Sequence, residues 1–209
     1  MKCIGIALFP GGQLDSDFAF AMERLGVATK TLGHTESDLG GCEAMVLPSP
    51  MSFGGYYRPG ALAAHTPLAR AIKGFAQEGG RVVGIGDGFA VLTELKLLPG
   101  ALLPNTGAQF LSTEGVCRVV DNRHAFFQKQ APGSVLKLHM ATPNANYILP
   151  PDIEPSAIRV ALRFEEGNVF SKSGVAAVVN TAGNVLGMLP IPERSWDADG
   201  GRLLASMFC

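Results

Sequence analysis

Short apolar runs alternate with amphipathic segments along most of the chain. The runs are rich in β-branched residues and show no polar alternation, which is typical of strands buried on both faces of a parallel sheet. The first amphipathic segment has Asp15 as a candidate N-cap and stops at Gly26, which suits a helix. The predicted strands are residues 3–9, 44–47, 81–85, 176–179 and 185–189, and the predicted helices are residues 15–25, 68–78 and 89–95.

The order of these elements predicts the fold class. Strands that alternate with helices form right-handed βαβ units, so we expect an α/β protein with a doubly wound, mostly parallel sheet. Residues 105–152 are less regular, with a short alternation over residues 116–120. A chain of 209 residues fits one large α/β domain, so we expect a single domain spanning residues 1–209.

Composition narrows the function classes. Hydrophobic residues make up 47% of the chain and charged residues 17%, enough for a sizeable core. A formal net charge of -1 gives no electrostatic reason to expect nucleic acid or an anionic membrane as a partner. No apolar run reaches the roughly 20 residues that span a bilayer, and the first run lacks a signal-peptide cleavage site, so a cytoplasmic location is expected. The four cysteines match no zinc or redox motif, so we expect neither metal nor cofactor.

The most informative segment is GIGDG at residues 84–88, which follows a predicted strand and precedes a predicted helix. A G-x-X-x-G turn between a strand and a helix is the geometry of a nucleophile elbow. The central residue of such a turn is held in a strained conformation, at a helix N-terminus that favours a thiolate or an oxyanion. Here the central residue is Gly86, which has no side chain that could attack a substrate.

Several segments in the same order resemble one family, the class I glutamine amidotransferases, and within it the glutaminase subunits of phosphoribosylformylglycinamidine synthase. The resemblance covers about residues 1–104 and 175–209 and implies a flavodoxin-like fold. It also implies the synthetase subunit of that enzyme, which acts in purine biosynthesis, as a partner. The matching segments are FPGG at 9–12, GHTE at 33–36, SFGGYYRPGA at 52–61, VGIGDGF at 83–89, LTELKLLPGA at 92–101 and NTAGNVLGMLPIPER at 180–194.

Carried over residue by residue, the catalytic groups of the family are missing. The position of the nucleophilic Cys is Gly86 and that of the general-base His is Ile191, while the residue that orients the His remains as Glu193. The oxyanion-hole positions correspond to Pro50 and Asp87, and proline has no N–H to donate. Removing a nucleophile or base costs on the order of 10⁶ in kcat, so the resemblance implies a protein that cannot hydrolyse glutamine.

Three functions stay open at this point. The chain could be a structural or regulatory subunit that still docks on the synthetase, a small-molecule binding module, or an enzyme with different chemistry in the old pocket. Asp87 would be the substitute nucleophile in the last case, with His34, His65, His124 or His139 nearby, although a helix-capping role is favoured. Glu193 is expected to be a turn or salt-bridge residue beside Arg194.

The loop at residues 52–58 is the candidate interface with the partner. In the family this loop lies near the mouth of the active site, and aromatic residues with an arginine are enriched in interface cores. The alternative is a loop that packs on its own aromatic rings. The interface candidates are Ser52, Phe53, Tyr56, Tyr57 and Arg58.

Overall fold

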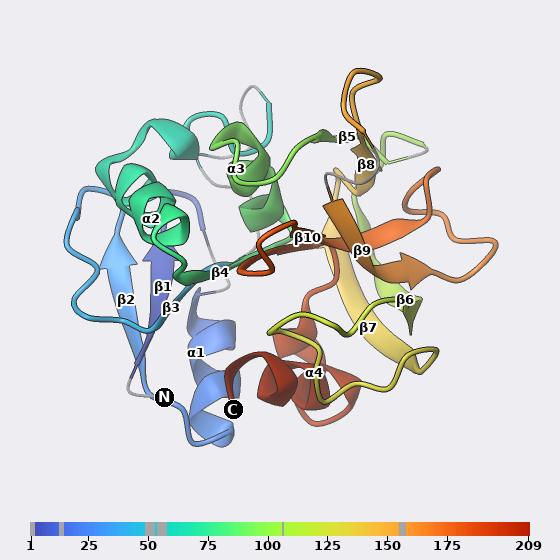
Figure 1. Cartoon of the computed structure of the whole chain (residues 1–209). Coiled ribbons are helices and arrows are strands. Elements are labelled where there is room, and N and C mark those ends of the chain that lie inside the picture. Colours follow the sequence, from blue (N-terminus) through green and yellow to red (C-terminus); the bar gives the residue numbers. More distant parts are fainter. Residues whose placement is uncertain (1–2, 13–14, 49–52, 54–57, 106, 155–157) are drawn as a thin grey trace.

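One mixed β-sheet runs through the molecule, with helices on both of its faces (Figure 1). The computed structural model describes residues 3–12, 15–48, 53, 58–105, 107–154 and 158–209. Within these residues the sheet has nine strands in the order β2-β1-β3-β4-β11-β10-β9-β6-β7. The strands from β2 to β11 in this order are parallel, and the neighbours from β11 to β7 pair antiparallel.

The parallel half carries the order β2-β1-β3-β4, which is that of a flavodoxin-like doubly wound sheet. Its inner strands are buried on both faces, so their sequences are almost continuously apolar. The structure confirms the predicted α/β class and the predicted strands of this half, and adds β2 at the edge. The bounds are Ile4–Leu8 for β1, Thr29–Gly33 for β2, Ala44–Leu47 for β3, Arg81–Ile85 for β4 and Val185–Met188 for β11.

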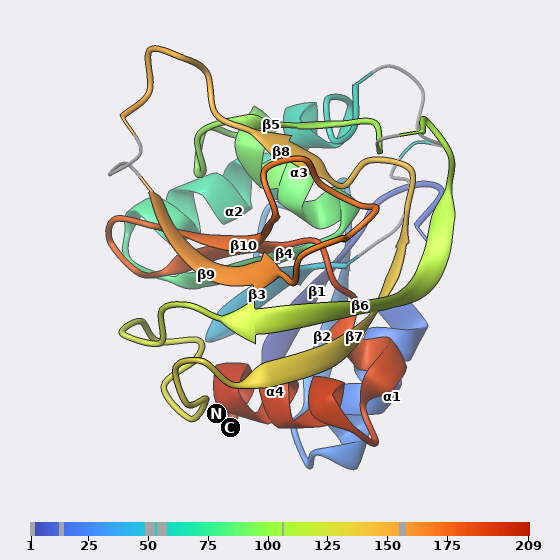
Figure 2. The ribbon, with the colours of Figure 1, turned by 90° about the vertical axis from the view of Figure 1, so that its right-hand side faces the viewer.

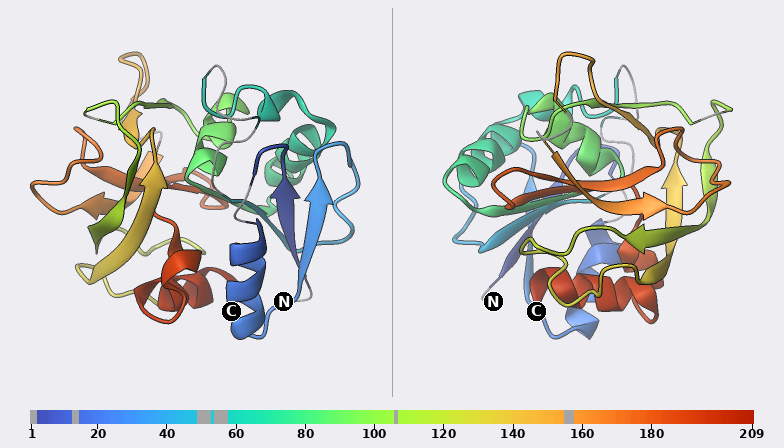
Figure 3. Two further views of the ribbon diagram at one scale, coloured as in Figure 1. Left: turned by 180° about the vertical axis from the view of Figure 1, so that it is seen from behind. Right: turned by 45° about the vertical axis from the view of Figure 1, so that its right-hand side comes forward.

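Two helices cover each face of the sheet. The helices α2 and α3 lie on one face, while α1 and α4 lie on the other (Figures 1 and 3). The rings of Phe18 on α1 and Phe208 on α4 meet edge-to-face with centroids 5.9 Å apart, which joins the second pair. The bounds are Asp15–Arg24 for α1, Pro67–Gln77 for α2, Asp87–Glu94 for α3 and Asp199–Phe208 for α4, with short 3₁₀ turns η2 at Ala63–His65 and η4 at Pro192–Ser195.

Two strands of the antiparallel half, β6 and β7, come from residues 105–152, the region whose sequence was least regular, and β10 matches the strand predicted at 176–179. The alternation at 116–120 falls in the long strand β6 except for its last residue, and β7 lies beside α4 (Figure 2). A two-stranded ribbon, β5 with β8, lies apart from the main sheet. The bounds are Ala101–Leu103 for β5, Leu111–Val119 for β6, Val135–Thr142 for β7, Asn146–Ile148 for β8, Ile158–Phe164 for β9 and Val175–Asn180 for β10.

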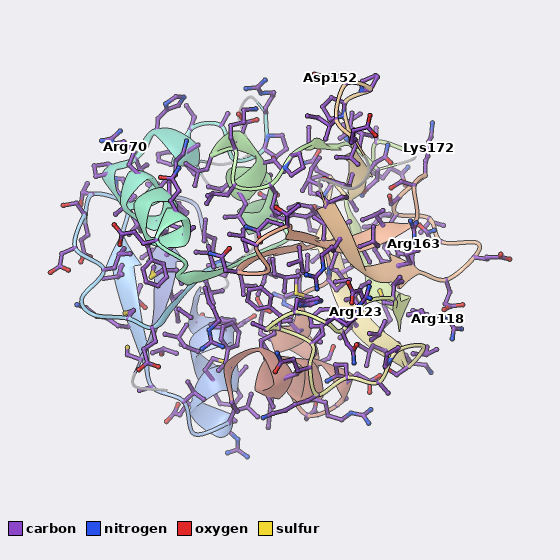
Figure 4. The ribbon with its side chains drawn as sticks, in the orientation of Figure 1. Arg70, Arg118, Arg123, Asp152, Arg163 and Lys172 are labelled. Carbon is purple, nitrogen blue, oxygen red and sulfur yellow. The ribbon has the colours of Figure 1, made fainter. Side chains whose placement is uncertain are left out.

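Labelled arginines of the antiparallel half lie on the outside of the molecule (Figure 4). Arg118 pairs with Glu165 at 2.7 Å and Arg123 pairs with Asp121 at 3.1 Å. Arg118 and Arg123 therefore each have an acidic neighbour, while Arg163 donates to the carbonyl of Ser173 at 3.0 Å.

Candidate functional site

The predicted elbow is present at the carboxyl end of β4. The strand ends at Ile85, Gly86 makes the turn, and α3 begins at Asp87, two residues earlier than the sequence predicted. Gly86 has φ 55° and ψ −115°, a conformation that L side chains adopt only under strain. Its N–H donates to the carbonyl of Met188 at 2.8 Å, and its own carbonyl accepts from Phe89 at 3.0 Å. The backbone therefore has the shape of a nucleophile elbow, with glycine at its centre.

The glycines on either side of the turn allow α3 to lie directly on the sheet. A Cβ on Gly84 would lie 2.5 Å from the carbonyl oxygen of Gly88. A Cβ on Gly88 would lie 1.8 Å from the carbonyl oxygen of Leu47 on β3. Both distances are shorter than any real Cβ contact, so these two positions need glycine for packing. The motif is thus required by the close approach of helix and strands.

Asp87 is buried at this turn, with 4% of its surface exposed. The sequence predicted that its side chain caps α3, but Gly86 occupies the N-cap position and Asp87 is the first residue of the helix. A carboxylate in the first turn is still favoured by the partial positive charge of the helix N-terminus. The prediction of an N-cap at Asp87 is wrong, because the helix starts earlier than its apolar pattern indicated.

The second part of the site is the segment that follows the carboxyl end of β11. There the chain leaves the parallel half of the sheet and contacts β7. Ile191 is fully buried, and its N–H donates to the carbonyl of His139 on β7 at 2.8 Å. The N–H of Gly86 donates to the carbonyl of Met188, the last residue of β11. The elbow and the segment after β11 therefore lie at the carboxyl ends of the neighbouring strands β4 and β11. Sequence reasoning gave no reason to place His139 beside Ile191.

Glu193 follows on η4 with only 2% of its surface exposed. Neither of its carboxylate oxygens has a hydrogen-bond partner in any other described residue. Burial raises the pKa of Glu193 to about 8; the nearby Asp17 adds to the rise, while its own backbone N–H and Arg194 act against it. Of the two predicted roles, turn or salt bridge, the structure shows the turn, and Arg194 pairs with Asp17 at 3.4 Å.

The candidate interface loop can be placed only in part. Ser52, Tyr56 and Tyr57 lie outside the described residues, as does Pro50, which the resemblance placed at the oxyanion hole. Phe53 is half-buried, and its ring meets that of His34 edge-to-face at 6.1 Å. Its N–H donates to the carbonyl of Pro10, so this residue contacts the segment that follows β1.

Arg58 lies at the end of the same loop and is the more accessible of the two placed candidates. Its side chain is 77% exposed and pairs with Glu94 on α3 at 3.0 Å. Phe53 therefore contributes to packing, while Arg58 presents a charge at the surface.

The remaining histidines lie in different surroundings. His124 is buried against Phe126 and Phe127, and one ring nitrogen lies 3.0 Å from the carbonyl of Asp121. Burial lowers the pKa of His124. His65 is exposed on η2. In the described part of the chain, no three His, Cys, Asp or Glu side chains are grouped so that they could hold a metal ion. No helix in that part is long and apolar enough to cross a membrane.

Comparison with known proteins decides the family. The chain is 40% identical over 203 residues to the phosphoribosylformylglycinamidine synthase subunit PurQ of Parasynechococcus marenigrum, covering 95% of this chain and 94% of that protein. The chain belongs to the PurQ family. The PurQ of Thermus thermophilus is 39% identical over 203 residues, covering 92% and 89% of the two chains. A search of protein-family models finds no match.

Solved structures agree with this family and fold. A chain in the structure of PurLQS from Thermotoga maritima superposes with a TM-score of 0.90 at 31% identity, covering 99% of this chain and 97% of that one. A glutamine amidotransferase from Thermotoga maritima superposes with a TM-score of 0.60 at 13% identity, a likeness of fold alone. The predicted resemblance to PurQ and the predicted class I glutamine amidotransferase fold are confirmed.

Proposed function

We propose that this PurQ-family protein is a cytoplasmic subunit of phosphoribosylformylglycinamidine synthase in purine biosynthesis that does not itself hydrolyse glutamine. Its role is structural or regulatory: it docks on the synthetase partner, as its relatives are named as subunits of that enzyme. The observation that carries the proposal is Gly86 at the centre of the elbow, where the turn presents only an α-carbon.

Two further observations support the loss of activity. The position of the base is Ile191, whose side chain is fully buried and has no group that accepts a proton. Glu193, which would orient a histidine there, has a raised pKa and is largely protonated at neutral pH. A triad without nucleophile and base loses on the order of 10⁶ in kcat. A neutral Glu193 would also give little support to a positive charge on a base.

The decisive experiment measures ammonia release from glutamine by the chain alone and with the synthetase subunit. We expect no glutamine-dependent ammonia in either case, and co-elution of the two proteins on gel filtration in the presence of nucleotide. A γ-glutamyl adduct trapped on any side chain would refute the claim of inactivity. Failure to co-elute, with both proteins folded, would refute the docking role.

A matched variant separates a missing nucleophile from a lost fold. In Gly86→Cys the thiol would be placed at the elbow centre, whose backbone already has the required φ of 55°. Combined with Ile191→His, this variant also gives Glu193 a partner. We expect the double variant to be labelled by a glutamine-analogue electrophile at residue 86 while the wild type remains unlabelled. Labelling of the wild type, and its loss in Asp87→Ala, would instead support chemistry at Asp87.

A further inference from the structure

Two thiols lie side by side at the amino ends of β1 and β3. The Sγ atoms of Cys3 and Cys42 are 3.9 Å apart, with the thiol of Cys42 directed at the sulfur of Cys3. Both cysteines are free; Cys3 is partly exposed, while Cys42 is 6% exposed. Neither residue belongs to the carboxyl edge of the sheet where the elbow lies. The pair therefore has no part in the function proposed above.

The backbone places the two cysteines at the start of adjacent strands. The N–H of Glu43 donates to the carbonyl of Cys3 at 3.0 Å, and β1 pairs with β3 from Ile4 and Ala44 onward. The register of the two strands puts Glu43 opposite Cys3 and Cys42 one residue earlier, so the case for the pair rests on the 3.9 Å between the two sulfurs. The sulfurs must approach to about 2.05 Å. A change of one staggered χ1 rotamer moves a sulfur by about 3 Å, which is enough.

Because Gly5 has no side chain, the sulfurs of Cys42 and Met45 occupy the space that a Cβ there would take. Gly5 lies next to the pair, and a Cβ there would be 3.3 Å from the sulfur of Cys42 and 2.4 Å from that of Met45. Burial raises the pKa of Cys42 to about 11; the hydrogen bond to Cys3 and the charge of Asp38 add to the rise, and Lys30 on β2 opposes it. Cys42 is thus the protonated thiol, and the more accessible Cys3 is the one that meets a reagent first.

We propose that Cys3 and Cys42 form a reversible disulfide by exchange with a low-molecular-weight disulfide such as oxidised glutathione. The thiolate of Cys3 attacks one sulfur of the reagent, which breaks the S–S bond and releases the first small thiolate. Cys42 then loses its proton and attacks the sulfur of Cys3, and the second small thiolate leaves. Two protein thiols are oxidised and one small disulfide is reduced. The two small thiolates that leave take up the two protons that the cysteines release.

This bond would join two strands that are already neighbours, between cysteines 39 positions apart in the sequence. It would leave the folded structure almost unchanged and restrict the unfolded chain. For a loop of this length in a protein of this size we expect the Tm to rise by about 8–16 °C. The effect does not depend on whether the protein hydrolyses glutamine.

The test uses the full chain with Cys209→Ser, because Cys209 is exposed and would otherwise form bonds between molecules. The protein is equilibrated with reduced and oxidised glutathione at a series of ratios. We expect the intact mass to fall by two hydrogen atoms with no glutathione attached, a proteolytic map with a Cys3–Cys42 cross-link, and the rise in Tm given above. The rate of closure should increase with pH, since Cys42 must lose its proton to attack.

Matched variants identify the pair. Adding Cys42→Ser should leave a glutathione adduct on Cys3 and abolish the rise in Tm, whereas adding Cys117→Ser should leave the cross-link intact because Cys117 is buried elsewhere, on β6. The cross-link map of the Cys209→Ser protein itself does not rely on these variants folding. An adduct that persists on Cys3 at every ratio, with Cys42 still open to alkylation, would overturn the proposal.

Discussion

The buried carboxyl of Glu193 makes a quantitative prediction about stability and pH. Its pKa rises from an ordinary value of 4.5 to about 8 in the folded protein, because burial disfavours the charged form. The folded state therefore holds a proton that the unfolded state has already lost. The contribution of Glu193 to stability is complete below pH 4.5 and is lost progressively as the pH rises to about 8.

The size of the effect follows from the proton linkage. Each pH unit between the two pKa values costs about 1.4 kcal/mol. The protein is therefore expected to lose about 2 kcal/mol of unfolding free energy between about pH 6 and pH 8 through this group alone. In Glu193→Gln the side chain cannot ionise, so this loss should disappear. The variant should become the more stable protein toward about pH 8.

Urea unfolding followed by the fluorescence of Trp196 is the natural assay. Trp196 is the only tryptophan, and its ring packs edge-on against Phe20 with centroids 5.6 Å apart, near η4. The wild type and Glu193→Gln are compared from about pH 6 to pH 8.5. Glu23→Gln, which changes an exposed carboxyl on α1, is the control and should keep the wild-type slope.

Other titrating groups do not disturb this comparison. His124, with a lowered pKa, affects stability mainly below pH 6.5 and is present in all three proteins. The pKa values of Cys42 and Cys117 are raised from 9.0 to about 11 and about 12, so these thiols lower the stability mainly above about pH 9, and they are present in all three proteins. If Glu193→Gln kept the same pH slope as the wild type, Glu193 would already be ionised or partnered in the folded protein. The argument from its burial would then fail.

Three further predictions test the geometry. Gly86→Ala should lower the free energy of unfolding by about 1–3 kcal/mol, because residue 86 has a φ of 55°. The control Gly74→Ala lies inside α2, where a Cβ has open space, and should raise the free energy of unfolding by about 0.5–1 kcal/mol. Equal effects of the two variants in urea unfolding would contradict the strained elbow. Gly88→Ala places a Cβ 1.8 Å from the carbonyl oxygen of Leu47, so soluble protein with native circular dichroism and unchanged stability is not expected. Arg58→Ala removes only an exposed ion pair and should lower the free energy of unfolding by less than about 0.5 kcal/mol. Weaker co-elution of this variant with the synthetase would therefore report on the interface. A large loss of stability would show instead that Arg58 has a structural role.

The sequence predicted the parallel half of the sheet because its inner strands are apolar on both faces. The edge strand β2 was missed, since Lys30 and Thr31 are exposed and interrupt its apolar pattern. The helix α4 was missed because Gly200 and Gly201 look like a helix break. In the structure they allow close approach, since Cβ atoms there would lie 2.0 Å and 1.8 Å from the carbonyl oxygens of Pro192 and Trp196.

The candidate site was predictable where a local motif defines it and not where distant segments meet. Gly86 could be placed at the elbow from the glycines around it. The bridge between His139 and Ile191 joins residues from two halves of the sheet, and no local pattern encodes it. That Glu193 finds no partner among the described residues likewise depends on the three-dimensional direction of Arg194, which points to Asp17.

The main-chain bonds at positions 86 and 191 do not depend on which side chain stands there. The amide of Gly86 is bound to Met188 and the amide of Ile191 to His139, each at 2.8 Å. Neither bond involves a side chain. The side chain at either position could therefore change without breaking these bonds, so the scaffold of the site is built independently of the chemistry that the site carries.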